Sequence, residues 1–106
     1  IARDNHHQRS IASLTGNLGN SYRLKQAYTQ AIEYYLAALK MAQAMDDKYN
    51  IAHWHNNLGV MYATIRQYDT ARYQYELALA QYQALHIERM VQAVIVNMEL
   101  TLPQVD

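Results

Sequence analysis

The chain has 106 residues, of which 51% are hydrophobic, and its nine basic side chains balance nine acidic ones. This length suits one small domain with a core of its own, and the absence of net charge argues against nucleic acid or an anionic membrane as the main partner. Cysteine is absent, which excludes disulfides and thiolate metal sites, and no apolar run reaches the roughly 18 to 20 residues that span a bilayer. We therefore expect a soluble protein, with the cytoplasm as the default location.

An internal repeat is the strongest signal in the sequence, because shifting the chain by 40 residues places many identical residues on one another. The first copy contributes Ile11, Ala12, Asn17, Leu18, Gly19, Tyr22, Tyr28, Ala31, Tyr35, Ala38, Leu39, Gln43 and Ala44 to these matches. A second shift of 40 reaches residues 92–102, where Asn97 repeats the asparagine. The chain is therefore expected to consist of two full structural units and part of a third.

The periodicity inside each unit is helical. In the second copy, apolar side chains recur at three- and four-residue steps from Ile51 to Ile65, and a second such series runs from Ala71 to Tyr82. Each unit is therefore expected to be a helical hairpin, and the fold to be all-α. In chain order, we expect helices at residues 7–24, 28–45, 48–65, 68–85 and 88–101.

Several residues are candidates for helix ends. Thr29 and Asp69 are plausible N-caps of the second helix in each hairpin. Asp46 and Asp47 lie at a turn, where they are expected to be solvated or to cap the third helix. Pro103 is expected to end the last helix.

Two matched segments of the repeat resemble the tetratricopeptide repeat pattern. They are Leu18-Gly19-x2-Tyr22 with Ala31-x3-Tyr35, and Leu58-Gly59-x2-Tyr62 with Ala71-x3-Tyr75. The resemblance covers residues 11–85 well and 88–102 in part. Thr15 and His55 stand where the pattern has tryptophan, tyrosine replaces phenylalanine, and the period is 40 instead of 34.

Repeats of this length are similar to those of kinesin light chains, Pins-type polarity adaptors and many bacterial signalling proteins. The resemblance implies a solenoid of about five helices in a single domain over residues 1–106. Its first repeat would lie at about 8–45, its second at about 48–85, and the first helix of a third at about 88–101.

Glycine inside a helix costs about 1 kcal/mol relative to alanine, so Gly19 and Gly59 require a compensating contact. The resemblance implies that these glycines let the first helix of a hairpin approach small residues of the second. The small residues at those positions are Ala31, Ala38, Ala71 and Ala78.

The asparagines call for a different explanation. Asn57 shares a helix face with His53, Asn56 and Val60, away from the apolar stripe. The resemblance places this face in the concave groove of the solenoid, where Asn17, Asn57 and Asn97 would form a ladder. A carboxamide can pair with both the N–H and the C=O of an extended peptide, so the ladder predicts binding of a peptide segment of a partner protein. The groove positions implied by the resemblance are Ser13, Asn17, Asn20, Arg23, His53, Asn56, Asn57, Val60, Ala93, Val96, Asn97 and Leu100.

The expected ligand has an acidic or amide group near Arg23 and an apolar side chain near Val60, Val96 and Leu100. The alternative for the asparagines is that they are solvated or pair with a neighbouring helix. Ligand binding by the asparagine ladder and structural pairing both remain open at this point.

The tyrosines at repeat positions are expected to lie in the core, whereas the remaining ones should be freer, some of them exposed. The remaining ones are Tyr34, Tyr49, Tyr73 and Tyr82. His6-His7 and His53-x-His55 lack the i, i+4 spacing of two metal ligands on one helix, so we expect no metal. His53 is interpreted as a groove residue and His55 as a contact between helices.

No nucleophile, base and orienting group can be assembled by spacing. We therefore expect neither enzymatic activity nor a cofactor.

The last helix retains Met90, Val96 and Leu100 without a second helix to cover them. The chain starts with Ile1, and one interpretation is that it is a segment of a longer repeat array. Alternatively, two copies bury these side chains together, or the patch binds a partner. The expected function is therefore an adaptor that binds a peptide, with an oligomerisation element or a regulatory segment of a larger signalling protein as alternatives.

Overall fold

A computed structural model describes residues 5–104 of the chain. Within this range the regular structure consists of helices, which confirms the all-α prediction. They are α1 (Asn5–Leu24), α2 (Tyr28–Ala44), α3 (Lys48–Thr64), α4 (Tyr68–Ala84) and α5 (Glu88–Thr101). The expected boundaries lie within two residues of these, and the largest difference is at the start of α1, which begins at residue 5 instead of 7.

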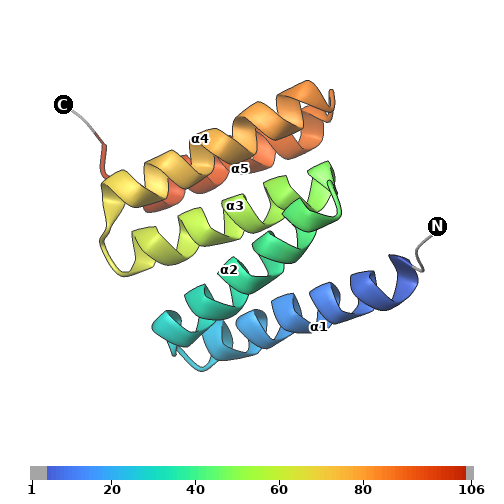
Figure 1. Ribbon diagram of the computed structural model, residues 1–106. Helices are drawn as coiled ribbons and strands as arrows, with labels where there is room; N and C mark the ends of the chain where they lie inside the picture. The colour runs from blue at the N-terminus through green and yellow to red at the C-terminus, as the bar shows by residue number, and fades with distance from the viewer. Residues whose placement is uncertain (1–4, 105–106) are drawn as a thin grey trace.

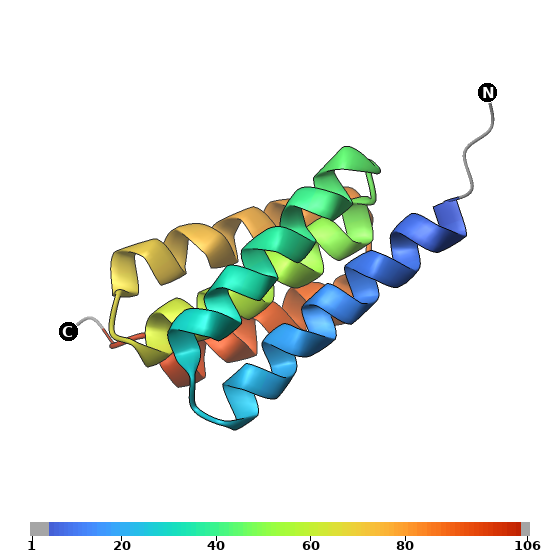
Figure 2. The same cartoon turned by 60° about the horizontal axis from the view of Figure 1, so that its bottom comes forward.

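The helices stack as successive hairpins. α1 packs on α2, α2 on α3 and α3 on α4, while α5 packs on both α4 and α3. Figure 1 shows the first four helices following one another across the molecule in sequence order, and Figure 2 shows the same stack from a tilted view. The result is an elongated body with principal extents of 55 × 33 × 19 Å, as expected of a solenoid in which each unit contacts its neighbours.

The connections between the helices share one geometry. Each contains a residue with positive φ, and these residues recur every 20 positions as Gln26, Asp46, Arg66 and His86. In the first connection, Ala27 N–H donates to Tyr22 O at 2.9 Å and Gln26 N–H donates to Arg23 O at 2.9 Å. This is the Schellman arrangement that satisfies the last carbonyls of a helix, and the other three connections repeat it.

The helix starts differ in part from expectation. Thr29 and Asp69 are not N-caps, because each is the second residue of its helix. The N-cap positions are Ala27 in α2 and Gln67 in α4, and neither side chain makes a capping hydrogen bond. The preceding Schellman turns fix where these helices can start, and this constraint overrides the preference of Thr and Asp. Asp47 does cap α3, since its carboxylate accepts the backbone N–H of Asn50.

The last helix ends where proline predicts. Leu102 follows α5 with an extended backbone, as the steric restriction before Pro103 requires. The expected end of the helix is confirmed.

The core forms two clusters, one for each hairpin and the helix stacked on it. Tyr35, Trp54 and Leu58 are buried in the first cluster. Tyr75 and Val94 are buried in the second. Each cluster therefore joins one repeat to the next, which is how a short solenoid acquires a continuous core.

Close packing at the glycines is confirmed, but the contacting residue is a tyrosine. A Cβ added to Gly19 would lie 2.8 Å from the ring of Tyr35, and one added to Gly59 would lie 2.6 Å from the ring of Tyr75. The glycines therefore admit aromatic rings, where small alanines had been expected. Ala31 contributes a backbone oxygen 3.3 Å from the Gly19 position.

The tyrosines outside the repeated pattern differ in burial, and Tyr34 among them is half-buried. Tyr49 and Tyr73 are exposed, as expected for some of them, whereas Tyr82 is completely buried, with an exposed fraction of 0%. Its ring meets Tyr49 edge-on at a centroid distance of 5.7 Å. The expectation that Tyr82 is free was wrong, because the ring fills the space between α3, α4 and α5.

Candidate functional site

A polar cavity of about 400 Å³ opens where the first helices of successive repeats meet. We call it the asparagine pocket. Side chains from α1, α3 and α5 form it, with one residue from α2. Its lining consists of Asn20, Arg23, Tyr35, His53, Asn57, Val60 and Asn97.

On the α1 side, a tyrosine orients an asparagine. The Tyr35 hydroxyl donates a hydrogen bond to Asn20 Oδ1. Burial raises the pKa of Tyr35, and the nearby charge of Arg23 opposes that shift. Because its carbonyl oxygen is occupied, Asn20 presents its amide N–H groups as the groups available to a ligand.

The α3 and α5 sides contribute two further carboxamides. Asn57 makes no hydrogen bond with another described side chain and is half-buried. Asn97 Nδ2 donates to Asn56 Oδ1 at 3.2 Å, and Asn56 is only 8% exposed. Asn97 therefore pairs with the neighbouring helix through its nitrogen and keeps its carbonyl oxygen as an acceptor.

His53 and Val60 complete the wall on α3. The His53 ring meets Trp54 edge-on at a centroid distance of 4.6 Å. Burial lowers the pKa of His53, so the imidazole is neutral near pH 7. Val60 is half-buried and packs against both core clusters, which makes it an apolar surface beside the amides.

The remaining groove positions expected from the sequence lie elsewhere. Ser13 lines two other cavities near the start of α1, and Asn17 is exposed outside the asparagine pocket. Asn56 does not line the pocket but accepts the hydrogen bond from Asn97. On α5, half-buried Ala93 is outside the lining.

The apolar groove positions of α5 also lie outside the pocket lining. Val96 and Leu100 are exposed by 47% and 78%. Met90, expected to join them in a patch, is half-buried and packs against the second core cluster.

Tyr35 is the lining residue that the sequence did not assign to the site. Its repeat position predicted a core ring, and its ring is indeed buried. The presence of tyrosine instead of phenylalanine at this core position could have indicated a role in the site. A buried tyrosine hydroxyl usually needs a hydrogen-bond partner, whereas phenylalanine needs none. His55, outside the pocket, contacts α4 as expected, with Nδ1 2.7 Å from Gln74 Oε1.

The lining therefore offers neutral donors and acceptors and one cation, Arg23. Within residues 5–104, no group of three or more His, Cys, Asp or Glu side chains is placed to hold a metal ion. No helix in the same range has the length and apolar character needed to cross a membrane. The carboxamides and the guanidinium of the lining can form hydrogen bonds with a ligand.

Comparison with known proteins gives two matches. A family model described as tetratricopeptide repeat matches residues 10–84. Among curated proteins, the uncharacterized protein ycf37 of Guillardia theta is 40% identical over 62 residues, which cover 58% of this chain and 34% of the relative. The chain thus spans about a third of the length of that relative, and no solved structure matches it.

Proposed function

The chain belongs to the tetratricopeptide repeat family, and from that premise we propose that it binds an extended segment of a partner protein in the asparagine pocket. Repeats of this family generally act as protein–protein interaction modules and as non-enzymatic scaffolds. The proposal specifies which surface of this chain would carry that role.

One observation carries the proposal: asparagines from three successive first helices surround one open cavity with hydrogen-bonding capacity unfilled. Asn20 has free donors, Asn97 has a free acceptor, and Asn57 has both. An extended peptide presents alternating N–H and C=O groups, which these carboxamides can pair with regardless of the peptide's side chains. Such pairing supports binding of main chain.

The rest of the lining suggests what the side chains of the segment would be. Arg23 favours an acidic or amide group, since its guanidinium donates to planar acceptors. Val60, which belongs to the α3 part of the lining, favours an apolar side chain of the peptide. Val96 and Leu100 could extend this apolar contact along α5, because both are exposed.

The repeat itself supplies the control for a binding experiment. Asn17 and Asn57 occupy equivalent positions of the two repeats, yet only Asn57 lines the pocket. Peptides that bind the intact chain would be selected from a random displayed library. Their affinity would then be measured by fluorescence anisotropy. Asn57→Ala should weaken binding about tenfold, the cost of one unmade buried hydrogen bond, whereas Asn17→Ala should leave the affinity within about twofold.

Circular dichroism should show unchanged helicity in both variants, so that a loss of affinity reports on the site. If no peptide is enriched, or if both substitutions have equal effects, the asparagine pocket is not the binding surface.

A second candidate function is self-assembly through apolar surface. Leu14 on α1 is 64% exposed and Leu100 on α5 is 78% exposed. Large exposed apolar side chains at both ends of a stack favour contacts with another chain. The corresponding test is whether the mass of the particle depends on concentration.

A further inference from the structure

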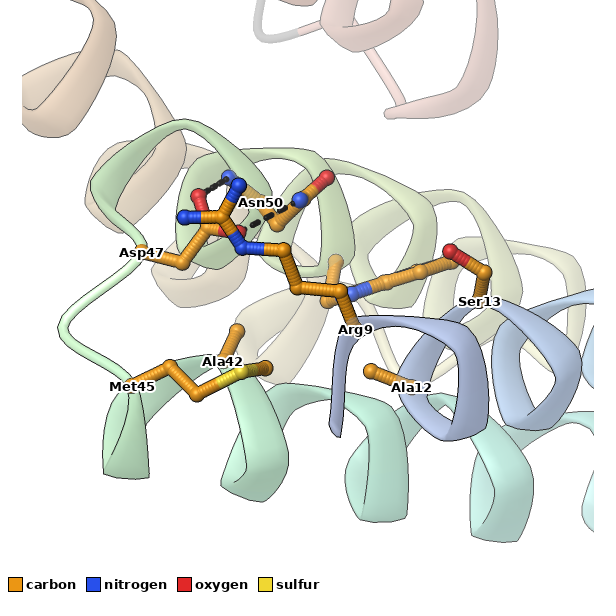
Figure 3. A pocket seen from close by; sticks show the side chains of 8 residues that line it. Arg9, Ala12, Ser13, Ala42, Met45, Asp47 and Asn50 are labelled. Carbon is orange, nitrogen blue, oxygen red and sulfur yellow. Dashed lines mark hydrogen bonds between the residues drawn. The ribbon is translucent and has the colours of Figure 1, made fainter. Parts of the chain in front are cut away.

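A second cavity, of about 160 Å³, lies between the start of α1, the end of α2 and the start of α3. We call it the Trp54 pocket. Its apolar lining is Ala12, Ala42, Met45 and Trp54, and its polar lining is Arg9, Ser13, Asp47 and Asn50. Figure 3 shows Ala42 on α2, Met45 just after the end of α2, and Ala12 on α1. The Arg9 side chain extends from α1 toward Asp47 and Asn50.

The internal repeat reveals what is missing from this pocket. Forty residues further on, Ala42 corresponds to Tyr82 and Arg9 corresponds to Tyr49. In the second repeat, the chain fills the corresponding space with the Tyr82 ring, which is fully buried and meets Tyr49 edge-on. In the first repeat, the ring is replaced by a methyl group.

Trp54 compensates for only part of that exchange. It corresponds to Val94 in the second repeat, so it brings a larger side chain. Its indole, however, is directed to Gly16, where an added Cβ would lie 2.0 Å from Trp54 Cη2, and it stacks on Tyr35 at 5.7 Å. The space beside Ala42 therefore stays open, and its size matches a cavity of about 150 Å³ that accepts benzene in another protein.

Two side chains of opposite charge, Arg9 and Asp47, lie at the mouth of the pocket. Both carboxylate oxygens of Asp47 accept hydrogen bonds from Asn50, one from the backbone N–H at 3.3 Å and one from Nδ2 at 2.7 Å. Arg9 is exposed and forms no ion pair within the described part of the chain. Hydrogen bonds from neutral groups leave the charge of Asp47 in place, so the mouth carries one negative and one positive charge. The exposed Arg9 cation suits the face of an aromatic ring.

We propose that the Trp54 pocket binds an aromatic side chain, tyrosine or phenylalanine, of the peptide held in the asparagine pocket. The link to a peptide rests on the proposed function. Both pockets lie along the seam between α1 and α3, and His53 of one contacts Trp54 of the other.

The spacing of the pockets sets the position of the aromatic residue. Asn20 lies seven positions after Ser13, and Asn57 lies seven positions after Asn50. Seven positions correspond to roughly 10 Å along a helix. An extended chain covers that distance in about three residues. The aromatic side chain should therefore lie about three residues from the peptide unit bound by Asn57.

The first experiment tests the pocket without any peptide. p-Cresol, a small-molecule analogue of the tyrosine side chain, would be titrated into the intact chain. Binding would be followed by NMR through the amide and indole N–H resonances. We expect saturable shifts centred on Ala42, Asn50 and the Trp54 indole. Ala42→Tyr should reduce the affinity for p-cresol at least about tenfold, because it supplies the ring that the second repeat already contains.

A second variant protects against a folding failure. Helicity and thermal midpoint would be measured for Ala42→Tyr, and Ala42→Leu, which fills less of the cavity, would replace it if it does not fold. Absence of p-cresol shifts around Trp54, or equal p-cresol affinity in the wild type and the folded variant, would overturn the inference.

The second experiment distinguishes this inference from the peptide proposal. In a selected peptide, replacing the aromatic residue by alanine should cost about tenfold in affinity for the wild type and little for Ala42→Tyr. Peptides that require Asn57 but no aromatic residue would overturn the inference and leave the peptide proposal intact. p-Cresol binding that Ala42→Tyr abolishes, together with unchanged peptide affinity in Asn57→Ala, would support the aromatic site and overturn only the peptide proposal.

Discussion

At the scale of single residues, two buried tyrosines of α4 differ in what their hydroxyl groups contact. Tyr75 Oη lies 2.7 Å from Thr101 Oγ1, which itself donates to Asn97 O at 2.7 Å. Tyr75 is therefore the donor of the first bond, because the threonine hydroxyl has only one hydrogen. Tyr82 Oη is buried and has no hydrogen-bond partner among the described residues.

This difference predicts opposite effects of the same substitution. Tyr75→Phe should lower the free energy of unfolding by about 1 kcal/mol, because it removes a satisfied hydrogen bond. Tyr82→Phe should leave the free energy unchanged or raise it by up to about 1 kcal/mol, because it removes a desolvated hydroxyl. Urea unfolding of both variants measures the two values, and each serves as the other's control; equal destabilisation would contradict the assignment.

The Tyr82 environment also affects its ionisation. Burial, with a smaller contribution from Tyr49, raises the pKa of Tyr82 to about 12. The ring is thus held as a neutral phenol in the core. The apolar series from Ala71 to Tyr82 placed this ring on the core-facing stripe of its helix, whereas the absence of tyrosine at the equivalent position of the first repeat argued for a freer ring.

At the scale of elements, the helices were predictable and their connections were not. The recurrence of apolar side chains at three- and four-residue steps predicted each helix, because this spacing places them on one face that can pack in a core. The left-handed residues Gln26, Asp46, Arg66 and His86 carry no common chemical signal, and none is the glycine or asparagine that usually marks such a turn. The short connection between two packed helices imposes the positive φ at this position.

These turns therefore hold strain that glycine can relieve. A residue with a side chain in the left-handed region costs about 1–2 kcal/mol, and Arg66, at φ 67°, is exposed. Arg66→Gly should raise the free energy of unfolding by about 0.5–1 kcal/mol after the added entropy of the unfolded chain is subtracted.

Thermal and urea unfolding would measure this gain. The matched control is Ala80→Gly at an exposed position inside α4, which should cost about 1 kcal/mol. Destabilisation by both glycines would mean that the turn at Arg66 is not strained.

At the scale of the whole molecule, the 40-residue repeat did not predict which residues line the asparagine pocket. Asn57 and Asn97 line the pocket, but on α1 the asparagine that lines it is Asn20, one turn beyond the repeat position Asn17. Asn57 lies between two first helices, whereas α1 has such a neighbour on one side only in this structure. Sequence equivalence therefore does not guarantee an equivalent environment at the end of a stack.

The same end effect leaves an apolar stripe on α1. Ile11, Leu14 and Leu18 are exposed there, although their repeat counterparts Ile51, Trp54 and Leu58 belong to the first core cluster or pack against it. A two-fold axis would place the stripe of one copy against the same stripe of a second copy, which would bury these apolar side chains.

We therefore expect the chain to associate through α1 more strongly than through α5. Sedimentation at several protein concentrations should give, at the highest concentration, a mass above the 12.3 kDa of a single chain. Leu14→Lys should weaken association at least about tenfold, because it places a charge in the apolar contact. Leu100→Lys, a matched change on α5, should have the smaller effect. A mass that stays monomeric at all concentrations would exclude the dimer, and a larger effect of Leu100→Lys would assign association to α5.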